Sequence, residues 1–587
     1  MLWYVIDSFF DLVKAYKKTF LILVSVYFIF FTFLIINKEK LKNPHKKPII
    51  FFKDLYYKNT LNTMKFFKLE ITFLVIIFLS LSCQNTITNQ KPNILFIIAD
   101  DASKKSFGAY GNESALTPSF DFLAKKGVLF TNAYNNNPKC SPARASILTG
   151  RYSWQLEEAA NHRPYLSDKW KYYPFLLENS GYFIGYTGKG WGPGVYKGID
   201  ISKTKLNPAG HLFEGEKLTS PFSGISKKNY SANFKNFLKS IPKNQPFCFW
   251  LGTHEPHRSY EKDSWKKQQR DTSKIKVPKF YPDHSTVVGD IADYEIEVEW
   301  FDKHIGEALA HLKDNDLLEN TIIVVTSDHG MPFPRVKGQI YEEGFSVPLI
   351  VFWKNKIQSG RIVSDFVTFP DIAPTLLDIA NVKIIDQMTG KSFKEQLLSK
   401  KSGRIDQERN FTILGKERHD IGRVDEGKFS VAYPVRAIRT DKYLYVKNFT
   451  PSRWPVGNPE YGFLNCDNSP TKSFIMSLKN DVLMSKYYKM NFDKRSEEEL
   501  YQISQDPECL INLAHTKNYK EIKDSLWLKL ERELTNQRDP RILGIGEIFD
   551  YYPYSRIPRQ QKLYNNLEYD PIKIFEDKFN QEINVKN

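Results

Sequence analysis

Residues 139–151 read KCSPARASILTGR, and this stretch predicts a short helix that presents two reactive side chains at its start. Pro142 is tolerated in a first helical turn, and Gly150 is a typical helix stop. Arg144 lies one turn after Cys140 on the same face of such a helix. A thiol and a cation would therefore point together at the helix N-terminus, where backbone N–H groups bind anions. An ordinary buried cysteine beside a helix is the alternative interpretation.

Two apolar stretches, one on each side of this helix in the sequence, end in acidic residues. Residues 93–101 read NILFIIADD, and residues 321–330 read TIIVVTSDHG. Both patterns are typical of buried parallel strands, and ligands bind at the edge where such strands end. The polar residues at the two strand ends are Asp100, Asp101, Asp328 and His329. Three carboxylates at one edge would repel one another unless a cation lay among them, and oxygen ligands favour Ca²⁺ or Mg²⁺. Taken alone, each acidic pair could equally be a solvated strand end.

Apolar strands alternate with amphipathic helices along most of the chain, which predicts an α/β sandwich with a mostly parallel central sheet. We expect the catalytic domain at residues 91–385, a smaller α+β subdomain at 386–545 and a tail without catalytic signals at 546–587. The expected strands lie near Ile94 and at 127–130, 183–186, 247–251, 322–326, 349–352, 436–439 and 443–446, and the expected long helices lie at 293–315 and 520–534.

The order of five motifs resembles that of the type I, formylglycine-dependent sulfatases, and is most similar to the heparan N-sulfatase (sulfamidase) branch. The motifs are ADD at 99–101, CSPAR at 140–144, HEPHR at 254–258, TSDHGMPFP at 326–334 and YPVR at 433–436. The resemblance covers about residues 91 to 540. It implies an alkaline-phosphatase-like sandwich with a mostly parallel central sheet and a smaller C-terminal α+β subdomain.

The resemblance also implies two cofactors. A formylglycine-generating enzyme would oxidise Cys140 to formylglycine, whose hydrated aldehyde supplies a hydroxyl nucleophile. One Ca²⁺ would be held by the modified Cys140 side chain and by the strand-end residues Asp100, Asp101, Asp328 and His329. Sulfamidase-like enzymes usually carry Asp-Asn where this chain has Asp-His at 328–329. Because other sulfatases carry Asp-His, we expect metal binding to survive.

Four further residues resemble the groups that surround the sulfate in this family: Arg144, Lys189, His254 and Lys337. The cations would stabilise charge on the transferring sulfuryl group. His254 would protonate the leaving nitrogen or oxygen, a duty that suits a histidine titrating near neutrality. Arg335 stands two residues before Lys337 and is the competing cation, although the motif alignment favours Lys337.

One motif departs from the family pattern. Many relatives carry a G-K-x-H type motif, whereas residues 183–193 read FIGYTGKGWGP and have the lysine without the histidine. Trp191 could occupy the histidine's place, or His257 or His162 could compensate. A structural tryptophan in a glycine-rich loop is the favoured interpretation.

Substrate contacts are expected from three residues. His257 lies in the HEPHR motif, and Arg418 and His419 lie in the charged segment KERHD at 416–420, where the catalytic domain should pass into the subdomain. A solvated charge run is the alternative for this segment.

The beginning of the chain contains two hydrophobic leaders. Residues 64–82 resemble a bacterial lipoprotein signal that ends before Cys83, which would then be lipidated, and 83–90 would be a linker. We therefore expect residues 1–63 to come from an over-extended start, with a membrane anchor at 20–36 as the competing interpretation. Either way the protein is expected to be exported, to the periplasm or the cell surface, and to be lipid-anchored to the bacterial outer membrane under the first interpretation.

Composition favours an exported enzyme over a nucleic-acid binder. The formal net charge is +16, yet no nucleic-acid-binding motif is apparent, and a moderately positive cleft would steer a sulfated polyanion. Of the five cysteines, Cys248 lies in an apolar strand and is expected to be core, and Cys466 and Cys509 form a possible disulfide.

The sequence thus favours a calcium- and formylglycine-dependent sulfatase that acts on a sulfated saccharide. An O-sulfatase for another glycan and a phosphonate or phosphodiester hydrolase of the same superfamily are the alternatives within the reaction class. The non-enzymatic alternative is a surface glycan-binding protein whose catalysis has lapsed.

Overall fold

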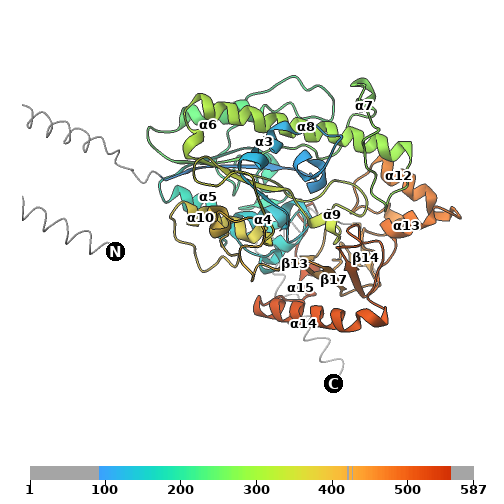
Figure 1. The fold of residues 1–587 in the computed structure, drawn as a ribbon. Helices are drawn as coiled ribbons and strands as arrows, with labels where there is room; N and C mark the ends of the chain where they lie inside the picture. Colours follow the sequence, from blue (N-terminus) through green and yellow to red (C-terminus); the bar gives the residue numbers. More distant parts are fainter. Residues whose placement is uncertain (1–90, 420–421, 426–427, 557–587) are drawn as a thin grey trace, which may run out of the picture. The chain divides into compact units, whose positions relative to one another are not determined.

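The computed structural model describes residues 91–419, 422–425 and 428–556 (Figure 1). The expectations for the two leaders, for Cys83 and for the last part of the tail fall outside these residues. Among the described residues, no helix combines the length and the apolar character that crossing a membrane requires.

The centre of the catalytic part is a seven-stranded sheet with the strand order β11-β2-β10-β9-β1-β8-β5. Strand β1 pairs in parallel with β8 on one side and with β9 on the other. Strand β10 is antiparallel to both β9 and β2, so the predicted sheet is mostly parallel with one reversed strand. The strand bounds are β11 (Arg361–Val363), β2 (Val128–Phe130), β10 (Leu349–Trp353), β9 (Thr321–Ser327), β1 (Asn93–Ala99), β8 (Phe247–Gly252) and β5 (Phe183–Gly188).

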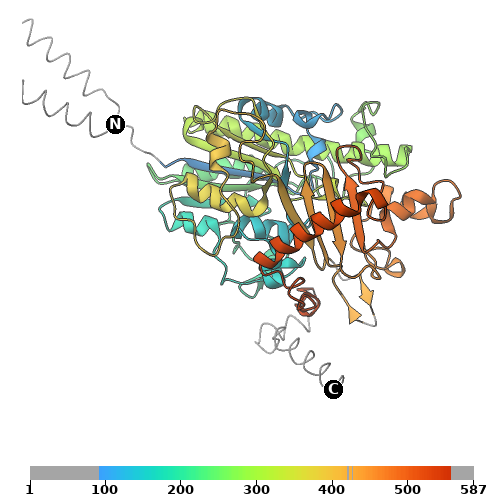
Figure 2. The same cartoon turned by 60° about the horizontal axis from the view of Figure 1, so that its bottom comes forward.

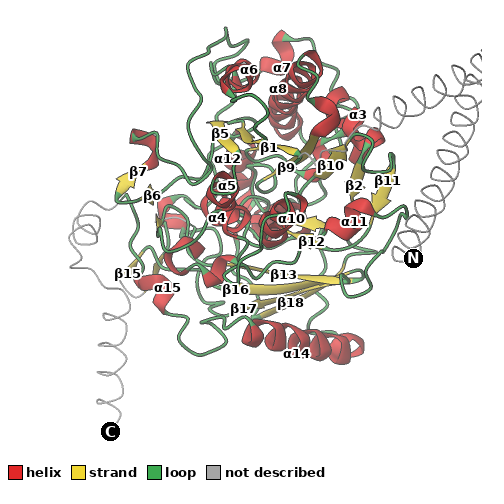
Figure 3. Ribbon diagram, turned by 90° about the vertical axis from the view of Figure 1, so that its left-hand side faces the viewer, coloured by secondary structure: helices red, strands yellow, loops and turns green. Residues whose placement is uncertain are grey.

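Helices cover both faces of this sheet (Figure 3). Because side chains alternate along a strand, β1 contributes to two cores. Its residues Ile94, Phe96 and Ile98 pack in the core that contains α4 (Cys140–Thr149), α5 (Tyr173–Glu178) and α10 (Ile372–Ile379). Its residues Leu95, Ile97 and Ala99 pack in the core that contains α3 (Pro118–Lys126), α6 (Tyr230–Ser240) and α8 (Ser285–Asp314). The predicted α/β sandwich is confirmed.

A second, antiparallel sheet follows in the C-terminal part and has the order β13-β16-β17-β18. One face packs against α14 (Lys520–Asn536), which crosses the sheet and buries Leu526, Leu530 and Leu534 (Figure 2). The other face packs against Tyr134 and Phe345 of the catalytic part. The strand bounds are β13 (Phe411–Lys416), β16 (Val435–Thr440), β17 (Tyr443–Asn448) and β18 (Glu498–Gln502). The predicted C-terminal α+β arrangement is therefore present.

Short elements complete the described chain. The helices among them are α7 (Ser264–Lys267), α9 (Glu342–Phe345), α11 (Lys394–Leu398), α12 (Pro470–Ser477), α13 (Ser485–Phe492) and α15 (Ile548–Tyr551). The strands are β3 (Ala133–Tyr134) with β12 (Val367–Thr368), β4 (Tyr165–Leu166) with β6 (Val195–Tyr196) and β7 (Ile199–Asp200), and β14 (Val424–Asp425) with β15 (Lys428–Phe429). Cys466 and Cys509 are both buried free thiols, so the disulfide considered possible from the sequence is not formed.

Candidate active site

The candidate site lies where parallel strands end at one edge of the central sheet. Asp100 and Asp101 follow β1, and Asp328 follows β9. The backbone N–H of Asp101 donates to Asp328 Oδ1 at 3.0 Å, which ties the two strand ends together. Asp101 has a φ of 75°, a left-handed conformation that Asp adopts more readily than most residues. The converging carboxylates predicted from the sequence are brought together here.

Helix α4 presents Cys140 at this edge. The helix begins at Cys140 and ends at the left-handed Gly150, as the sequence predicted. The Cys140 sulfur lies 3.3 Å from His329 Nε2 and 3.6 Å from Asp100 Oδ1. Burial raises the pKa of the thiol to about 12. The unmodified cysteine is therefore a neutral thiol at pH 7, which is a weak nucleophile.

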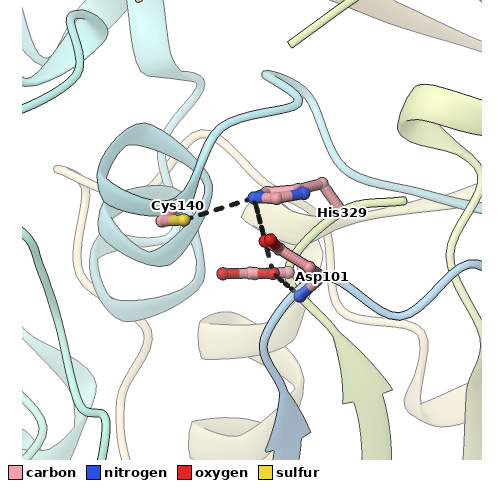
Figure 4. Close-up of side chains that lie close together, drawn as sticks. Asp101, Cys140 and His329 are labelled. Carbon is pink, nitrogen blue, oxygen red and sulfur yellow. Dashed lines mark hydrogen bonds and ion pairs between the residues drawn. The ribbon is translucent and has the colours of Figure 1, made fainter. Parts of the chain in front are cut away.

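Four side chains form a compact set of potential metal ligands. One ligand atom each from Asp101, Cys140, Asp328 and His329 lies within 4.8 Å of the others, and Figure 4 shows Cys140, His329 and Asp101 side by side. His329 Nε2 lies 3.2 Å from Asp101 Oδ1 and 3.6 Å from Asp328 Oδ1. The other expected ligand, Asp100, falls in a neighbouring set with Asp101 and His257.

The donor chemistry of this set fits a cation. His329 Nδ1 lies 3.0 Å from the carbonyl of Gly330 and must donate to it, so in the neutral ring Nε2 carries a lone pair. Nε2 lies beside the Cys140 sulfur and two carboxylate oxygens. Asp101 Oδ1 is buried and accepts no hydrogen bond within the described chain. A divalent cation would satisfy both atoms, and the carboxylate ligands favour Ca²⁺ or Mg²⁺.

Three cations surround the carboxylates. Lys189 Nζ donates to both oxygens of Asp100, at 2.6 and 2.5 Å, and Lys337 Nζ donates to Asp101 Oδ2 at 2.6 Å. Arg144 bridges Asp328, at 2.9 Å, and Asp100, at 3.3 Å. Burial alone would raise the pKa of Asp100, but Lys189 and Arg144 hold it well below its usual value. Asp100 is thus ionised, and each cation is held in a fixed position at the site.

His254 follows β8 and lines the cavity that opens over Cys140 and Asp100. Its backbone N–H donates to the Tyr230 hydroxyl at 3.1 Å. Burial, followed by the nearby Lys228, lowers the pKa of its imidazole to about 3. The ring is therefore neutral at pH 7 in the free protein, in contrast to the near-neutral titration expected from the sequence. The side chain of His257 is 37% exposed, and its Nε2 lies 3.9 Å from Asp101 Oδ2.

A cavity of about 650 Å³ opens over the site. Six of the predicted catalytic, metal and substrate residues line it, namely Asp100, Cys140, Lys189, His254, His257 and Lys337, and so do Trp191 and His162, the candidates for the place of the missing histidine. Asp467 was not predicted from the sequence. It also lines the cavity, and its Oδ2 lies 3.0 Å from Lys337 Nζ. This residue stands in a polar loop of the C-terminal part, and the sequence around it carries no signal that separates it from an ordinary turn.

Two ambiguities from the sequence concern positions near the site. Arg335 does not compete with Lys337, because its guanidinium donates to the Met490 carbonyl at 2.6 Å and lies over the Tyr341 ring at 4.0 Å. Trp191 is fully buried, and its ring N–H donates to the Ser141 carbonyl at 3.1 Å. It supports the first turn of α4, in keeping with a structural role.

The charged segment that precedes residue 420 is buried, so its interpretation as a solvated charge run is wrong. Arg418 donates to the carbonyls of Tyr552 at 2.7 Å and Pro553 at 3.0 Å. His419 Nε2 lies 3.0 Å from Asn137 Oδ1. Arg418 and His419 lie behind the cavity wall rather than among the described residues that line it. Their expected part in substrate contact stays a prediction.

Comparisons with known proteins add to this geometry. The family model described as Sulfatase matches residues 92–382. An ulvan-active sulfatase of Formosa agariphila is 27% identical over 76% of this chain and 82% of its own length. The N-sulphoglucosamine sulphohydrolase of Homo sapiens is 26% identical over 81% of this chain and 95% of its own length. A protein solved in complex with its substrate, D-glucosamine-2-N,6-O-disulfate, has a TM-score of 0.54 at 20% identity over 76% of this chain and 98% of that chain, which is a likeness of fold.

Proposed function

The chain belongs to the sulfatase family and is a hydrolase for sulfated saccharides, and we propose that it removes N-sulfate from a glucosamine-type sugar. We further propose that Cys140 acts after conversion to formylglycine and that one Ca²⁺ lies among the strand-end carboxylates. The observation that carries this proposal is the position of Cys140, whose sulfur is grouped with three potential ligands of a hard cation.

The unmodified Cys140 side chain is poorly suited to attack on sulfur. In the absence of a metal ion, burial raises the pKa of the thiol to about 12, so little of the reactive thiolate would be present. Formylglycine, when present, supplies a hydroxyl nucleophile at this position. One Ca²⁺ would be held by Asp101, Asp328 and His329. A cation at this position would polarise an oxygen of the bound sulfate.

The remaining residues position and neutralise the sulfate. Lys189 and Lys337 hold their ammonium groups at the cavity wall, where they would stabilise the charge that develops on the sulfuryl oxygens. Arg144 is fully buried and holds Asp100 and Asp328 in place. His254 presents an imidazole to the cavity, and a bound anion would favour its protonated form, which could then donate a proton to the leaving nitrogen.

We favour N-sulfate over O-sulfate as the substrate group because the match to one N-sulfate hydrolase extends over nearly the whole of that protein. The human N-sulphoglucosamine sulphohydrolase aligns over 95% of its own length. An O-sulfatase remains the second candidate, because an N-acetylglucosamine-6-O-sulfatase of Bacteroides thetaiotaomicron is also 26% identical, over 54% of this chain and 73% of its own length. Substrate choice lies in the loops around the cavity, which the fold alone does not fix.

The decisive experiment combines mass spectrometry with a substrate screen. The protein is co-expressed with a formylglycine-generating enzyme, and the mass of the peptide that contains Cys140 is measured. In parallel, sulfate release is measured on N-sulfated and O-sulfated sugars. Conversion at Cys140 with release from the N-sulfated sugar alone is the expected result. Release from an O-sulfated sugar alone would move the protein to the second candidate, and faster turnover of an aryl phosphonate than of an aryl sulfate would contradict both.

We also propose that the protein is exported and lipid-anchored at Cys83 in the bacterial outer membrane. The lipoprotein-like signal at residues 64–82 supports this proposal. Expression in a bacterial host with a radiolabelled fatty acid tests it. Label in the outer-membrane fraction that disappears in Cys83→Ser is expected, whereas an unlabelled protein would contradict the anchor.

A further inference from the structure

One wall of the cavity carries two cations and an imidazole that the catalytic geometry does not use. Lys139, the residue before Cys140, is 3% exposed and lines the cavity. Its ammonium has no hydrogen bond or ion pair to a described residue. His162 and Arg163 line the same cavity, and His162 Nδ1 is buried without a hydrogen-bond partner in the described chain. These three residues are called the basic wall below.

The other cations of the cavity are all paired, which sets the basic wall apart. Lys189 pairs with Asp100, and Lys337 pairs with Asp101 and Asp467. Lys228 pairs with Glu214 at 2.5 Å, and Arg258 pairs with Asp290 at 2.7 Å. Of the lysines and arginines that the structure places around the cavity, Lys139 and Arg163 are the two without an acidic partner. A buried ammonium without a partner carries a large desolvation cost unless a ligand supplies the counter-charge.

The three side chains of the basic wall act on one another. Burial, followed by Lys139 and Arg163, lowers the pKa of His162 well below its usual value. Burial alone would raise the pKa of Asp467, but Lys337 and then Lys139 lower it. Asp467, the carboxylate on which Lys139 acts, is therefore already paired with Lys337. A second anion can be accommodated without displacing a pair.

The loop that carries His162 and Arg163 is fixed on both sides. The Asn161 side chain donates to the Phe549 carbonyl and accepts from the Arg418 backbone N–H, both at 3.0 Å. The backbone N–H of His162 donates to the Arg418 carbonyl at 2.9 Å, and the Arg163 carbonyl accepts from Ser555 at 3.1 Å. The C-terminal part thus holds this loop in place before any ligand arrives, which limits the entropy lost on binding.

We propose that Lys139, His162 and Arg163 form a second anion subsite, which binds a carboxylate or a second sulfate of the same saccharide whose scissile sulfate lies at Cys140. The proposal rests on the function proposed above and narrows its substrate to a multiply charged sugar. Because Lys139 directly precedes Cys140, the second anion lies on the same sugar ring or on the next one. The guanidinium of Arg163 suits either group, since it can bind carboxylate and sulfate oxygens in pairs.

The test measures affinity as well as turnover, so that it does not depend on catalysis. Protein purified with an unconverted Cys140 is titrated by calorimetry with glucosamine N-sulfate, with glucosamine 2-N,6-O-disulfate and with an N-sulfated disaccharide that carries a uronate. Either doubly charged sugar is expected to bind more tightly than the N-sulfate alone. Lys139→Met is expected to reduce that preference by about 10- to 100-fold, the usual effect of losing a charged hydrogen bond.

Two further variants make the result specific. Arg163→Asn, whose side chain tolerates the φ of 54° at this position, is expected to reduce the same preference without disturbing the backbone. Lys228→Met removes one positive charge from the same cavity, at a lysine that is already paired with Glu214. This variant should weaken the binding of singly and doubly charged sugars to a similar extent, and so leave the preference unchanged. Thermal unfolding of each variant shows whether it is folded.

The outcomes separate the subsite from the proposed function. Loss of preference in Lys139→Met and Arg163→Asn, but not in Lys228→Met, supports the subsite, and the sugar that shows it identifies the anion. Equal affinity for singly and doubly charged sugars, or a preference that survives both variants, would overturn it. If the converted enzyme releases no sulfate from any of these sugars while the preference exists, the proposed function fails and the subsite stands.

Discussion

The charge cluster around Arg436 and the charge cluster around Asp101 are both buried, but only the first is complete without a ligand. Arg436 donates to both oxygens of Asp539, at 2.5 and 2.9 Å, and pairs with Glu417 at 2.9 Å. Arg541 completes the group by pairing with Glu417 at 2.7 Å. Two cations and two carboxylates satisfy one another, and they join strand β16 to the segment that follows α14.

The cluster at the end of β1 and β9 also consists of buried cations and carboxylates, but not all of its polar atoms have partners within the described chain. Its cations are paired, yet Asp101 Oδ1 accepts no hydrogen bond from a described residue, and His329 Nε2 lies 3.2 Å from Asp101 Oδ1 and 3.6 Å from Asp328 Oδ1. A buried group without a partner costs free energy, which a bound cation would offset. The comparison therefore distinguishes a cluster that contributes to folding from one that is open to a ligand.

The largest expected effect comes from Cys140→Ala. Loss of the nucleophile should lower kcat by about 10⁴-fold or more. The substitution removes a small buried side chain and should leave the protein folded. Sulfate release and the thermal midpoint, measured on the same preparation, check both statements. Substantial turnover by this variant would rule out covalent catalysis by this residue.

A smaller but still large effect is expected for Asp101→Asn. Without one charged ligand, calcium should bind more weakly, and activity at limiting calcium should fall by about 10³-fold. Titration of chelated enzyme with calcium measures the affinity. Asp539→Asn in the complete cluster is the matched control, and its calcium dependence should equal that of the wild type. An activity that is insensitive to chelation would contradict the metal assignment.

Arg436→Ala should affect stability and leave the chemistry unchanged. Removing one partner leaves Asp539 and Glu417 buried with less counter-charge, which typically costs about 3–5 kcal/mol in the free energy of unfolding. Denaturant unfolding measures this loss, and kcat per folded molecule should stay within about twofold of the wild type. A large fall in kcat at full folding would mean that this cluster is also functional.

The smallest effect concerns the ionisation of His254. The pKa is lowered to about 3, because burial and then Lys228 disfavour the charged ring, so His254 should remain neutral as the pH falls through about 6.5 in the free protein. Bound inorganic sulfate adds a negative charge beside the ring and should raise its pKa by about 1 unit. An NMR titration of the imidazole, assigned with His254→Gln, measures both values. Titration near 6.5 without sulfate would show that the ring is better hydrated than its position indicates.

Sequence patterns predicted the parts of the molecule that repeat a local rule. The apolar runs before Asp100 and Asp328 are strands, and helix α4 begins at Cys140 and ends at Gly150. The parallel order also brought the carboxylates to one edge. The reversed direction of β10 could not be predicted, because an apolar run reads the same in both directions.

The errors concern charged and loop residues whose surroundings come from distant parts of the chain. The segment that precedes residue 420 has the composition of a solvated surface, yet Glu417 finds Arg436 and Arg541, and Arg418 finds carbonyls near residue 552. Asp467 was missed for the same reason. These partners lie on other strands and segments, from Arg436 on β16 to the carbonyls near residue 552, and such tertiary contacts leave no periodic trace in the sequence.

The contact between Lys337 and Asp467 also bears on how such an enzyme can diverge. Lys337 belongs to the segment matched by the family model, whereas Asp467 belongs to the C-terminal part. A recombination event that exchanged the C-terminal part would therefore replace Asp467, the neighbour of Lys337, together with the support of the loop at 161–163. Inheritance of a new C-terminal part would alter substrate choice and the charge around the reacting sulfate in a single step, so these two properties are expected to evolve together.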